Sequence, residues 1–285
     1  MGVAVLDVIY SVDTYPLEDS EVRASSQRVC RGGNATNSLV VLAQLGHECS
    51  WAGVMAEDRD AAYIMEDLSQ HRIDMRHVVR VSDGRTPVSS IITSRSGSRT
   101  IVHYRDLPEL EFDEVVIQAI VKFDWLHFEG RNIKETHKIM KAVRQQAADL
   151  QISLEIEKNR DGIEALSEFA DHVFFSKGYM QTCGFDAPEK FLLEKHERYA
   201  HADLYCAQGE EGLHAVDKDG RQYFNCANND ITVVDTVGAG DALNAGLIHG
   251  CLQGLPMTRR LELACRLAAR KCSQSGFDAI NIKGL

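Results

Sequence analysis

Two hydrophobic patterns alternate along the chain. Short apolar runs, typical of buried strands, occupy residues 3–6, 50–55, 125–128, 152–156, 173–175 and 204–206. Apolar positions recur every three or four residues, as in helices that cover a sheet, in residues 37–45, 59–71, 135–149, 161–170 and 188–199. The alternation predicts an α/β fold whose central sheet is mostly parallel and has helices on its faces.

Two segments, residues 8–30 and 87–106, depart from this alternation. They mix polar and apolar residues around turn signals such as Ser96-Gly97, which predicts exposed antiparallel strands outside the main sheet. We expect these strands to form a small lid on a single domain that spans residues 1–285. A small open sheet leaves edges and one face uncovered, so we also expect a homodimer through the lid strands.

Composition narrows the functional class. A chain of 285 residues with 44% hydrophobic content can bury one substantial core. Its net charge of -11 disfavours nucleic acid as a partner, and no apolar run is long enough to cross a membrane. The first residues lack the features of a signal peptide, so we expect a cytoplasmic protein. Eight scattered cysteines without a Cys-x-x-Cys pair indicate reduced thiols rather than a zinc site.

The candidate chemistry begins with the run Asp235-Thr-Val-Gly-Ala-Gly-Asp241. It follows an apolar, strand-like stretch and leads into a helical pattern over residues 242–248. Backbone N–H groups at a helix N-terminus favour an anion, and a phosphoryl group in transit suits such a site. Asp241 would then orient and deprotonate the attacking hydroxyl. The alternative is a tight turn followed by an ordinary N-terminal helix carboxylate.

Two further features favour a kinase that acts on a polyol. In Arg31-Gly-Gly-Asn-Ala-Thr-Asn37, Asn34 and Asn37 lie three residues apart before a helix and can present amides to vicinal hydroxyls. Asp7 follows a buried strand, at the sheet edge where open α/β folds bind ligands. No Gly-x-x-x-x-Gly-Lys-Ser/Thr run is present, which excludes a P-loop enzyme.

These motifs resemble the two signatures of the ribokinase-like (PfkB) carbohydrate kinases, and within that family the likeness is strongest to the ketohexokinases. It extends over nearly the whole chain and includes Trp125-Leu-His-Phe-Glu-Gly-Arg-Asn132 and Gly276-Phe-Asp278. The resemblance implies a three-layer sandwich with a small β-sheet lid. It also implies ATP-dependent phosphorylation of a ketose, D-fructose at the C1 hydroxyl, with Mg²⁺ as cofactor and a K⁺ requirement left open.

The resemblance also implies roles for individual residues. Asp241 would be the base, Gly238, Ala239 and Gly240 the anion hole, and Arg99 a phosphate contact from the lid. The sugar would be held by Asp7, Gly33, Asn34 and Asn37, with Asp19 reaching the sugar site of the partner subunit. The nucleotide would be surrounded by Lys177, Gly209, Glu210, Gly212, Ala268 and Cys272. Glu157 is the candidate metal ligand.

Three departures from the family pattern keep alternatives open. Lys177-Gly-Tyr-Met180 stands in place of the Asn-x-x-Glu common in the family, as in ketohexokinases. Ser98 replaces an asparagine that touches the sugar in ketohexokinases, and Ala227-Asn-Asn229 replaces prolines. A kinase of the same fold acting on a modified ketose, ribose, a sugar acid or a nucleoside remains an alternative. So does a catalytically silent sugar-binding protein.

Overall fold

The computed structural model describes residues 1–94, 98–228, 230–278 and 280. Its largest sheet has six strands in the order β12-β11-β10-β9-β8-β7. The four strands from β7 to β10 run parallel, and β11 and β12 complete one edge in antiparallel pairing. The strands are β7 (Trp125–Glu129), β8 (Gln151–Ile156), β9 (His172–Phe175), β10 (Asp203–Ala207), β11 (Leu213–Val216) and β12 (Gln222–Asn225).

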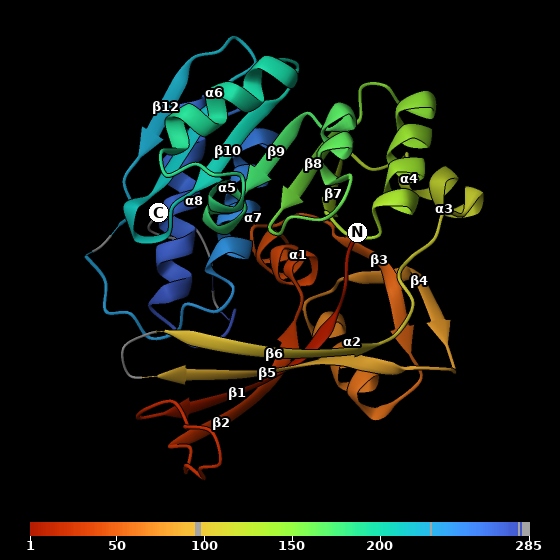
Figure 1. Ribbon diagram of the computed structural model, residues 1–285. Coiled ribbons are helices and arrows are strands. Elements are labelled where there is room, and N and C mark those ends of the chain that lie inside the picture. The colour runs from red at the N-terminus through yellow and green to blue at the C-terminus, as the bar shows by residue number, and fades with distance from the viewer. Residues whose placement is uncertain (95–97, 229, 279, 281–285) are drawn as a thin grey trace.

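Helices cover both faces of this sheet and bury a separate core on each (Figure 1). Successive strand residues point to opposite faces, so Phe174 packs in one core while its neighbours Val173 and Phe175 pack in the other. The first core is formed with α1 (Asn34–Gln44), α2 (Arg59–Gln70), α7 (Ala239–Leu252) and α8 (Met257–Cys272). The second is formed with α3 (Glu114–Ile120), α4 (Ile133–Gln146), η1 (Ile163–Phe169), α5 (Lys177–Thr182) and α6 (Pro188–Arg198). The result is a three-layer sandwich.

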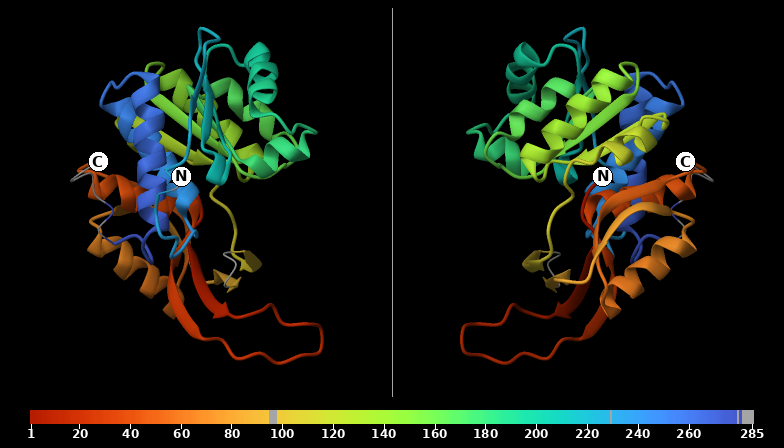
Figure 2. Two further views of the ribbon diagram at one scale, coloured as in Figure 1. Left: turned by 90° about the vertical axis from the view of Figure 1, so that its left-hand side faces the viewer. Right: turned by 90° about the vertical axis from the view of Figure 1, so that its right-hand side faces the viewer.

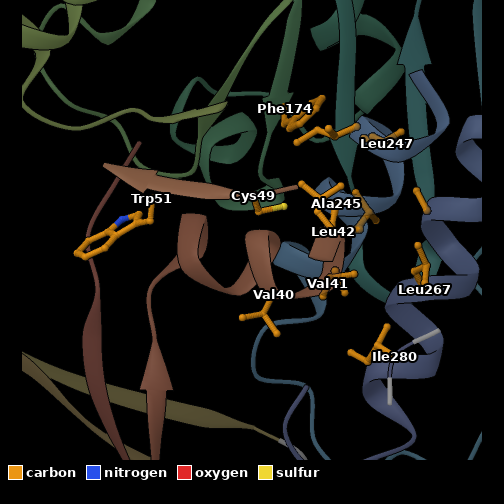
Figure 3. Close-up of a cluster of buried hydrophobic side chains, with 14 of the residues drawn as sticks. Val40, Val41, Leu42, Cys49, Trp51, Phe174, Ala245, Leu247, Leu267 and Ile280 are labelled. Atoms are coloured by element: carbon orange, nitrogen blue, oxygen red, sulfur yellow. The ribbon is translucent and has the colours of Figure 1, made fainter. Parts of the chain in front are cut away.

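The first core joins segments that lie far apart in the sequence. Figure 3 shows Leu42 of α1 near Ala245 of α7, and Phe174 of β9 near Leu247 of the same helix. Helix α7 is apolar nearly all round and is buried between the sheet and its neighbouring helices. Because α1 and α7 pack together, their first residues, which follow the two glycine-rich runs, come to the same region of the molecule.

A second sheet stands apart from the sandwich (Figures 1 and 2). Its four strands lie in the order β2-β1-β5-β6, with β1 and β5 parallel and the outer pairs antiparallel. Figure 2 shows the connection between β1 and β2 projecting from the body of the protein. These strands are β1 (Val5–Val12), β2 (Ser26–Gly32), β5 (Arg85–Ser94) and β6 (Arg99–Asp106), while β3 (Ser50–Ala56) and β4 (Asp74–Val81) form a parallel pair elsewhere.

The structure corrects several expectations about secondary structure. The strand expected at residues 3–6 runs on to Val12 and pairs in the four-stranded sheet, so Asp7 lies inside a strand and not at its end. The run expected at residues 50–55 pairs with β4 outside the six-stranded sheet. Val233 and Val234 are exposed and form no strand, and residues 163–169 form a 3₁₀ helix. The expected turn at Ser96-Gly97 and Asn229 lie outside the described residues.

Two further observations bear on the sequence analysis. All eight cysteines are free thiols. Within the described ranges, no helix has both the length and the apolar character needed to cross a membrane.

Candidate active site

A cavity of about 920 Å³ lies where the four-stranded sheet faces the sandwich. Its walls come from β1, β5 and β6 on one side, and from the beginnings of α1 and α7 and the ends of β7 and β8 on the other. Ten of the residues expected from the sequence line it. They are Asp7, Gly33, Asn34, Asn37, Arg99, Glu157, Gly238, Ala239, Gly240 and Asp241.

The N-terminus of α7 opens into this cavity. Gly238 is the N-cap residue and has the left-handed φ of 83° that glycine adopts most readily, and no side chain caps the terminus. A side chain at Gly238 would clash with the ring of Phe277, whereas a Cβ at Gly240 would meet no atom within 4 Å. Gly238 is therefore needed for the turn, while Gly240 leaves its own backbone open to the cavity.

Asp241 lies in the first turn of α7 and is only 7% exposed. Its Oδ2 accepts a hydrogen bond of 2.6 Å from Nδ2 of Asn37. Burial raises the pKa of Asp241 to about 7, and the charges of Glu129, Glu157 and Asp7 act in the same direction, against the hydrogen bond from Asn37. A carboxyl group with a pKa near neutrality is suited to accept a proton from a substrate hydroxyl.

Arg31 fixes the orientation of the Asn37 amide. Its guanidinium donates to Oδ1 of Asn37 and also to Asp67, and the side chain of Arg31 is almost fully buried. With Oδ1 occupied by a donor, the NH₂ group of Asn37 must point toward Asp241. The sequence analysis expected Asn37 to hold the sugar. In the structure, its amide is engaged by Arg31 and Asp241, and the part played by Arg31 was missed.

Asn34 faces two carboxylates that sequence reasoning did not single out together. Its Nδ2 lies 3.1 Å from Glu155 Oε2 and 3.4 Å from Glu157 Oε2. Glu155 also accepts a 3.1 Å hydrogen bond from Asn244, and burial raises its pKa well above the usual range. Both glutamates come from the end of β8, where a Glu-Ile-Glu run closes a buried strand.

Glu129, at the end of the neighbouring strand β7, was also missed. It pairs in register with Glu155, accepts a 2.8 Å hydrogen bond from the backbone N–H of Ala35 and forms a 3.0 Å ion pair with Arg131. Acidic residues that end two adjacent parallel strands must lie at one edge of a sheet. Glu129 and Glu155 each stand at the end of a predicted strand, so this rule could have predicted the acidic group from the sequence.

Asp7 lines the cavity from the middle of β1. Burial raises its pKa to about 6, while a hydrogen bond from Ser89 and the charges of Arg31 and Arg28 act in the opposite direction. A side chain at Gly32 would clash with the carboxylate of Asp7. Gly33 has a φ of 107°, and a side chain there would clash with the carbonyl oxygen of Val3. Both glycines are therefore fixed by close packing against β1 and the segment before it.

Arg99 approaches the α7 terminus from β6. Its guanidinium lies 3.4 Å from Oγ1 and 3.5 Å from the carbonyl oxygen of Thr236, two residues before Gly238. The four-stranded sheet thus contributes a positive charge next to the α7 terminus.

The residues expected around a nucleotide lie outside the cavity wall. Lys177 begins α5, and its Nζ forms a 2.6 Å ion pair with Glu211 of the 3₁₀ turn η2 (Gly209–Glu211). A side chain at Gly212 would clash with the backbone of Asn225, so this turn packs directly on the end of β12. Ala268 and Cys272 lie on α8, which also contacts β12. Both η2 and α8 thus contact β12, the edge strand of the six-stranded sheet.

Asp19 is far from these residues in the fold. It has a left-handed φ of 59° and lies in the exposed connection that projects between β1 and β2 (Figure 2). It does not line the cavity of its own chain.

Comparison with known proteins identifies the family. The profile of the pfkB family of carbohydrate kinases matches residues 1–283. The chain belongs to this family. It is 37% identical over 289 residues to ketohexokinase from Mus musculus, covering 98% of this chain and 97% of that protein. It is 25% identical to fructosamine kinase FrlD from Bacillus subtilis, covering 86% and 84% of the two chains.

The fold is also that of the family. The structure of Arabidopsis thaliana ribokinase complexed with ribose and ATP matches with a TM-score of 0.81, at 17% identity, over 96% of this chain and 92% of that one. The protein is therefore a carbohydrate kinase with a ribokinase-like three-layer sandwich and an additional small sheet.

Proposed function

We propose that this carbohydrate kinase transfers the γ-phosphoryl group of ATP to a ketose, D-fructose at its C1 hydroxyl. The observation that carries the proposal is the buried carboxylate of Asp241, which has a pKa near neutrality and lies beside the Gly238-Ala-Gly240 terminus of α7. End-to-end similarity to a ketohexokinase supports the choice of sugar. The structurally similar Arabidopsis thaliana ribokinase, solved in complex with ribose and ATP, supports the choice of donor.

In this proposal, Asp241 accepts the proton of the attacking hydroxyl while the backbone N–H groups of Gly238, Ala239 and Gly240 face the transferred group. Phosphoryl transfer depends mainly on positioning and on stabilising charge, and a helix terminus supplies both without a movable side chain. Arg99 adds a positive charge from the four-stranded sheet. Asn34 and Asp7 offer an amide and a carboxylate to the remaining sugar hydroxyls, and Gly33 lines the same wall of the cavity.

A bound Mg²⁺ would neutralise charge on the nucleotide phosphates. Glu157 is the residue that would hold it, because its carboxylate is partly exposed on the cavity wall. Mg²⁺ commonly uses one or two carboxylates together with phosphates and water. The described residues contain no group of three or more His, Cys, Asp or Glu side chains able to hold a metal.

For the nucleotide itself, we propose the edge formed by η2, β12 and α8. Gly209, Glu210 and Gly212 would border it on one side, Ala268 and Cys272 on the other, and Lys177 would reach it from α5. This edge continues from the cavity, since Ser176 and Gly178 flank Lys177 and line the cavity wall.

We also propose that the four-stranded sheet is a lid and that two chains pair through it. Val102 and Tyr104 on β6 are 65% and 59% exposed, and Leu17 in the projecting connection is 80% exposed. Covering such a face with a second copy would remove apolar surface from water. Asp19, which lies away from the cavity of its own chain, would then reach the sugar bound in the partner subunit.

One second candidate has support of its own. The similarity to fructosamine kinase FrlD favours a ketose that carries a substituent, bound in the same cavity. The cavity volume of about 920 Å³ accommodates more than an unmodified hexose and a phosphoryl group.

A coupled ADP-release assay over ketoses, aldoses, sugar acids, nucleosides and fructosamine tests the proposal. We expect D-fructose to give the highest kcat/KM, with phosphate on C1 of the product, and the assay is repeated with K⁺ replaced by Na⁺. Preference for fructosamine would favour the second candidate. Absence of ADP release with every compound would overturn the proposed kinase activity in favour of a sugar-binding protein.

A further inference from the structure

Three polar side chains lie in register across the four-stranded sheet. Asp7 of β1 is opposite Ser89 of β5, and Ser89 is opposite His103 of β6. Ser89 Oγ lies 3.1 Å from Nδ1 of His103, and the Ser89 hydroxyl acts on the neighbouring Asp7 carboxyl as a donor that lowers its pKa. All three residues line the 920 Å³ cavity. A row of three polar side chains therefore crosses three strands on the face of the sheet that lines the cavity.

The side of β6 that carries His103 is the inner side. Arg99, Ile101 and His103 line the cavity, whereas the alternate residues Val102 and Tyr104 do not and are strongly exposed. Asp7 and Ser89 are buried, but His103 stays accessible from the cavity. Of these three side chains, His103 is thus the one that a ligand in the cavity can contact.

The carboxylate of Asp7 determines which groups donate and which accept among Asp7, Ser89 and His103. An ionised carboxylate only accepts hydrogen bonds, and the Ser89 hydroxyl lowers the pKa of Asp7 as a donor does, so its oxygen is left to accept from Nδ1–H of His103. With its proton on Nδ1, a neutral imidazole has a bare lone pair on Nε2. Partial burial, together with the positive charges of Arg131, Arg105 and Lys158, lowers the pKa of His103 and favours this neutral form. Nε2 is then an acceptor that matches a sugar hydroxyl.

We propose that His103 is a specificity-determining residue whose Nε2 accepts a hydrogen bond from a sugar hydroxyl other than the one that Asp241 deprotonates. Ser89 is the positioning residue that holds the His103 ring and its tautomer. The inference rests on the proposed function, since it concerns the sugar bound in the same cavity. It adds a recognition group on the four-stranded sheet to the amides and carboxylates on the opposite wall.

Two substitutions at His103 form a matched pair. The amide of asparagine can replace Nδ1 and keep the contact with Ser89, whereas glutamine can replace Nε2. His103→Asn should raise the KM for sugar about tenfold, the effect of one lost hydrogen bond, with kcat and the KM for ATP nearly unchanged. His103→Gln should retain more of the sugar affinity. Ser89→Ala should raise the sugar KM by a smaller factor, because it frees the ring without removing Nε2.

The deciding experiment combines these variants with mono-deoxy analogues of the sugar that the wild-type chain phosphorylates best in the ADP-release panel. In the wild type, one analogue that keeps the reacting hydroxyl should lose about tenfold or more in kcat/KM. In His103→Asn, the same deoxy analogue should lose no further kcat/KM relative to the parent sugar, because the imidazole that bound the missing hydroxyl is already absent. Thermal unfolding of each variant verifies that the accessible substitution leaves the fold intact.

Two results separate the failure of this inference from failure of the proposed function. In the first, the wild type phosphorylates a sugar, but each deoxy analogue lowers kcat/KM by the same factor in His103→Asn as in the wild type. This result would overturn the role of His103 and leave the proposed function standing. Equal sugar KM values for wild type, His103→Asn and His103→Gln would do the same. A wild-type chain that releases no ADP with any sugar would overturn the proposed function, and this inference with it.

Discussion

Asn37 and Asp241 are joined by a 2.6 Å hydrogen bond between residues 204 positions apart in the sequence. The bond connects the helices that follow the two glycine-rich runs, and Arg31 orients it by donating to the other atom of the Asn37 amide. The candidate base is therefore not an isolated side chain. Its orientation depends on the sugar-side loop, so the two motifs act as one unit.

Replacing Asn37 with alanine should shift the pH dependence of the reaction. The hydrogen bond from Asn37 lowers the pKa of Asp241, so its loss should raise that pKa above about 7. A base must be deprotonated to act, and the acid limb of the kcat/KM profile should move to higher pH. Asn34→Ala is the matched control, because Asn34 contacts Glu155 and Glu157 and not Asp241. An unshifted acid limb in Asn37→Ala would argue against the hydrogen bond as the tuning contact.

The raised pKa of Asp241 should also be visible in stability. The ordinary pKa of 3.8 rises to about 7 on folding, so between these values the folded chain binds more protons than the unfolded chain. The free energy of unfolding contributed by this group must then fall as the pH rises from about 4 to 7. Compared with Asp241→Asn, the wild type should become progressively less stable over that window. Denaturation of both proteins from pH 4.5 to 8 measures the difference, and a constant difference would contradict the raised pKa.

Replacing Gly238 or Gly240 of the α7 terminus with valine should impair the protein in two different ways. At Gly240 the added side chain enters open cavity space, so the protein should fold normally. It should lose activity, because the valine side chain obstructs the transferred phosphoryl group. At Gly238 the left-handed φ and the clash with Phe277 should also lower the thermal unfolding temperature. Melting curves and turnover for both variants separate the effects. Normal turnover in Gly240→Val would refute the proposed anion hole.

Mixed dimers test whether the partner subunit completes the site. Asp19→Ala and Asp241→Asn chains should each be poorly active alone. If Asp19 serves the partner's cavity, a heterodimer of the two variants contains one undamaged site, so activity should recover toward a quarter of wild type when subunits exchange freely and statistically. Subunit exchange is verified with differently tagged chains. No recovery despite exchange, or a fully active monomer in light scattering, would rule out sharing of the site.

The sequence was most informative where a motif is local. The Gly238-Ala-Gly240 turn and the helix that follows it depend on neighbouring residues, and their positions were predicted correctly. The chain of contacts from Arg31 through Asn37 to Asp241 depends on the packing of α1 against α7. No pattern along the sequence measures that packing.

Asp7 illustrates the same limit for strands. The apolar run at residues 3–6 predicts a buried strand, but apolar character does not specify which strands pair with it. The observed pairing with β2 and β5 places Asp7 in the middle of β1, opposite Ser89. Val233 and Val234 show the converse, since their apolar character predicts a strand whereas the structure leaves them exposed and outside any strand.

The most direct test of the account is the turnover of Asp241→Asn with Mg-ATP and D-fructose, followed by ADP release and by ³¹P NMR of the product. The substitution keeps the size of the side chain and an acceptor for Asn37, but it removes the group that takes the proton. We predict a kcat lower by roughly 10² to 10⁴, the usual contribution of a general base, with nucleotide and sugar binding nearly retained. Turnover close to that of the wild type in a homogeneous preparation, with the same C1-phosphorylated product, would contradict the role of Asp241 as the base.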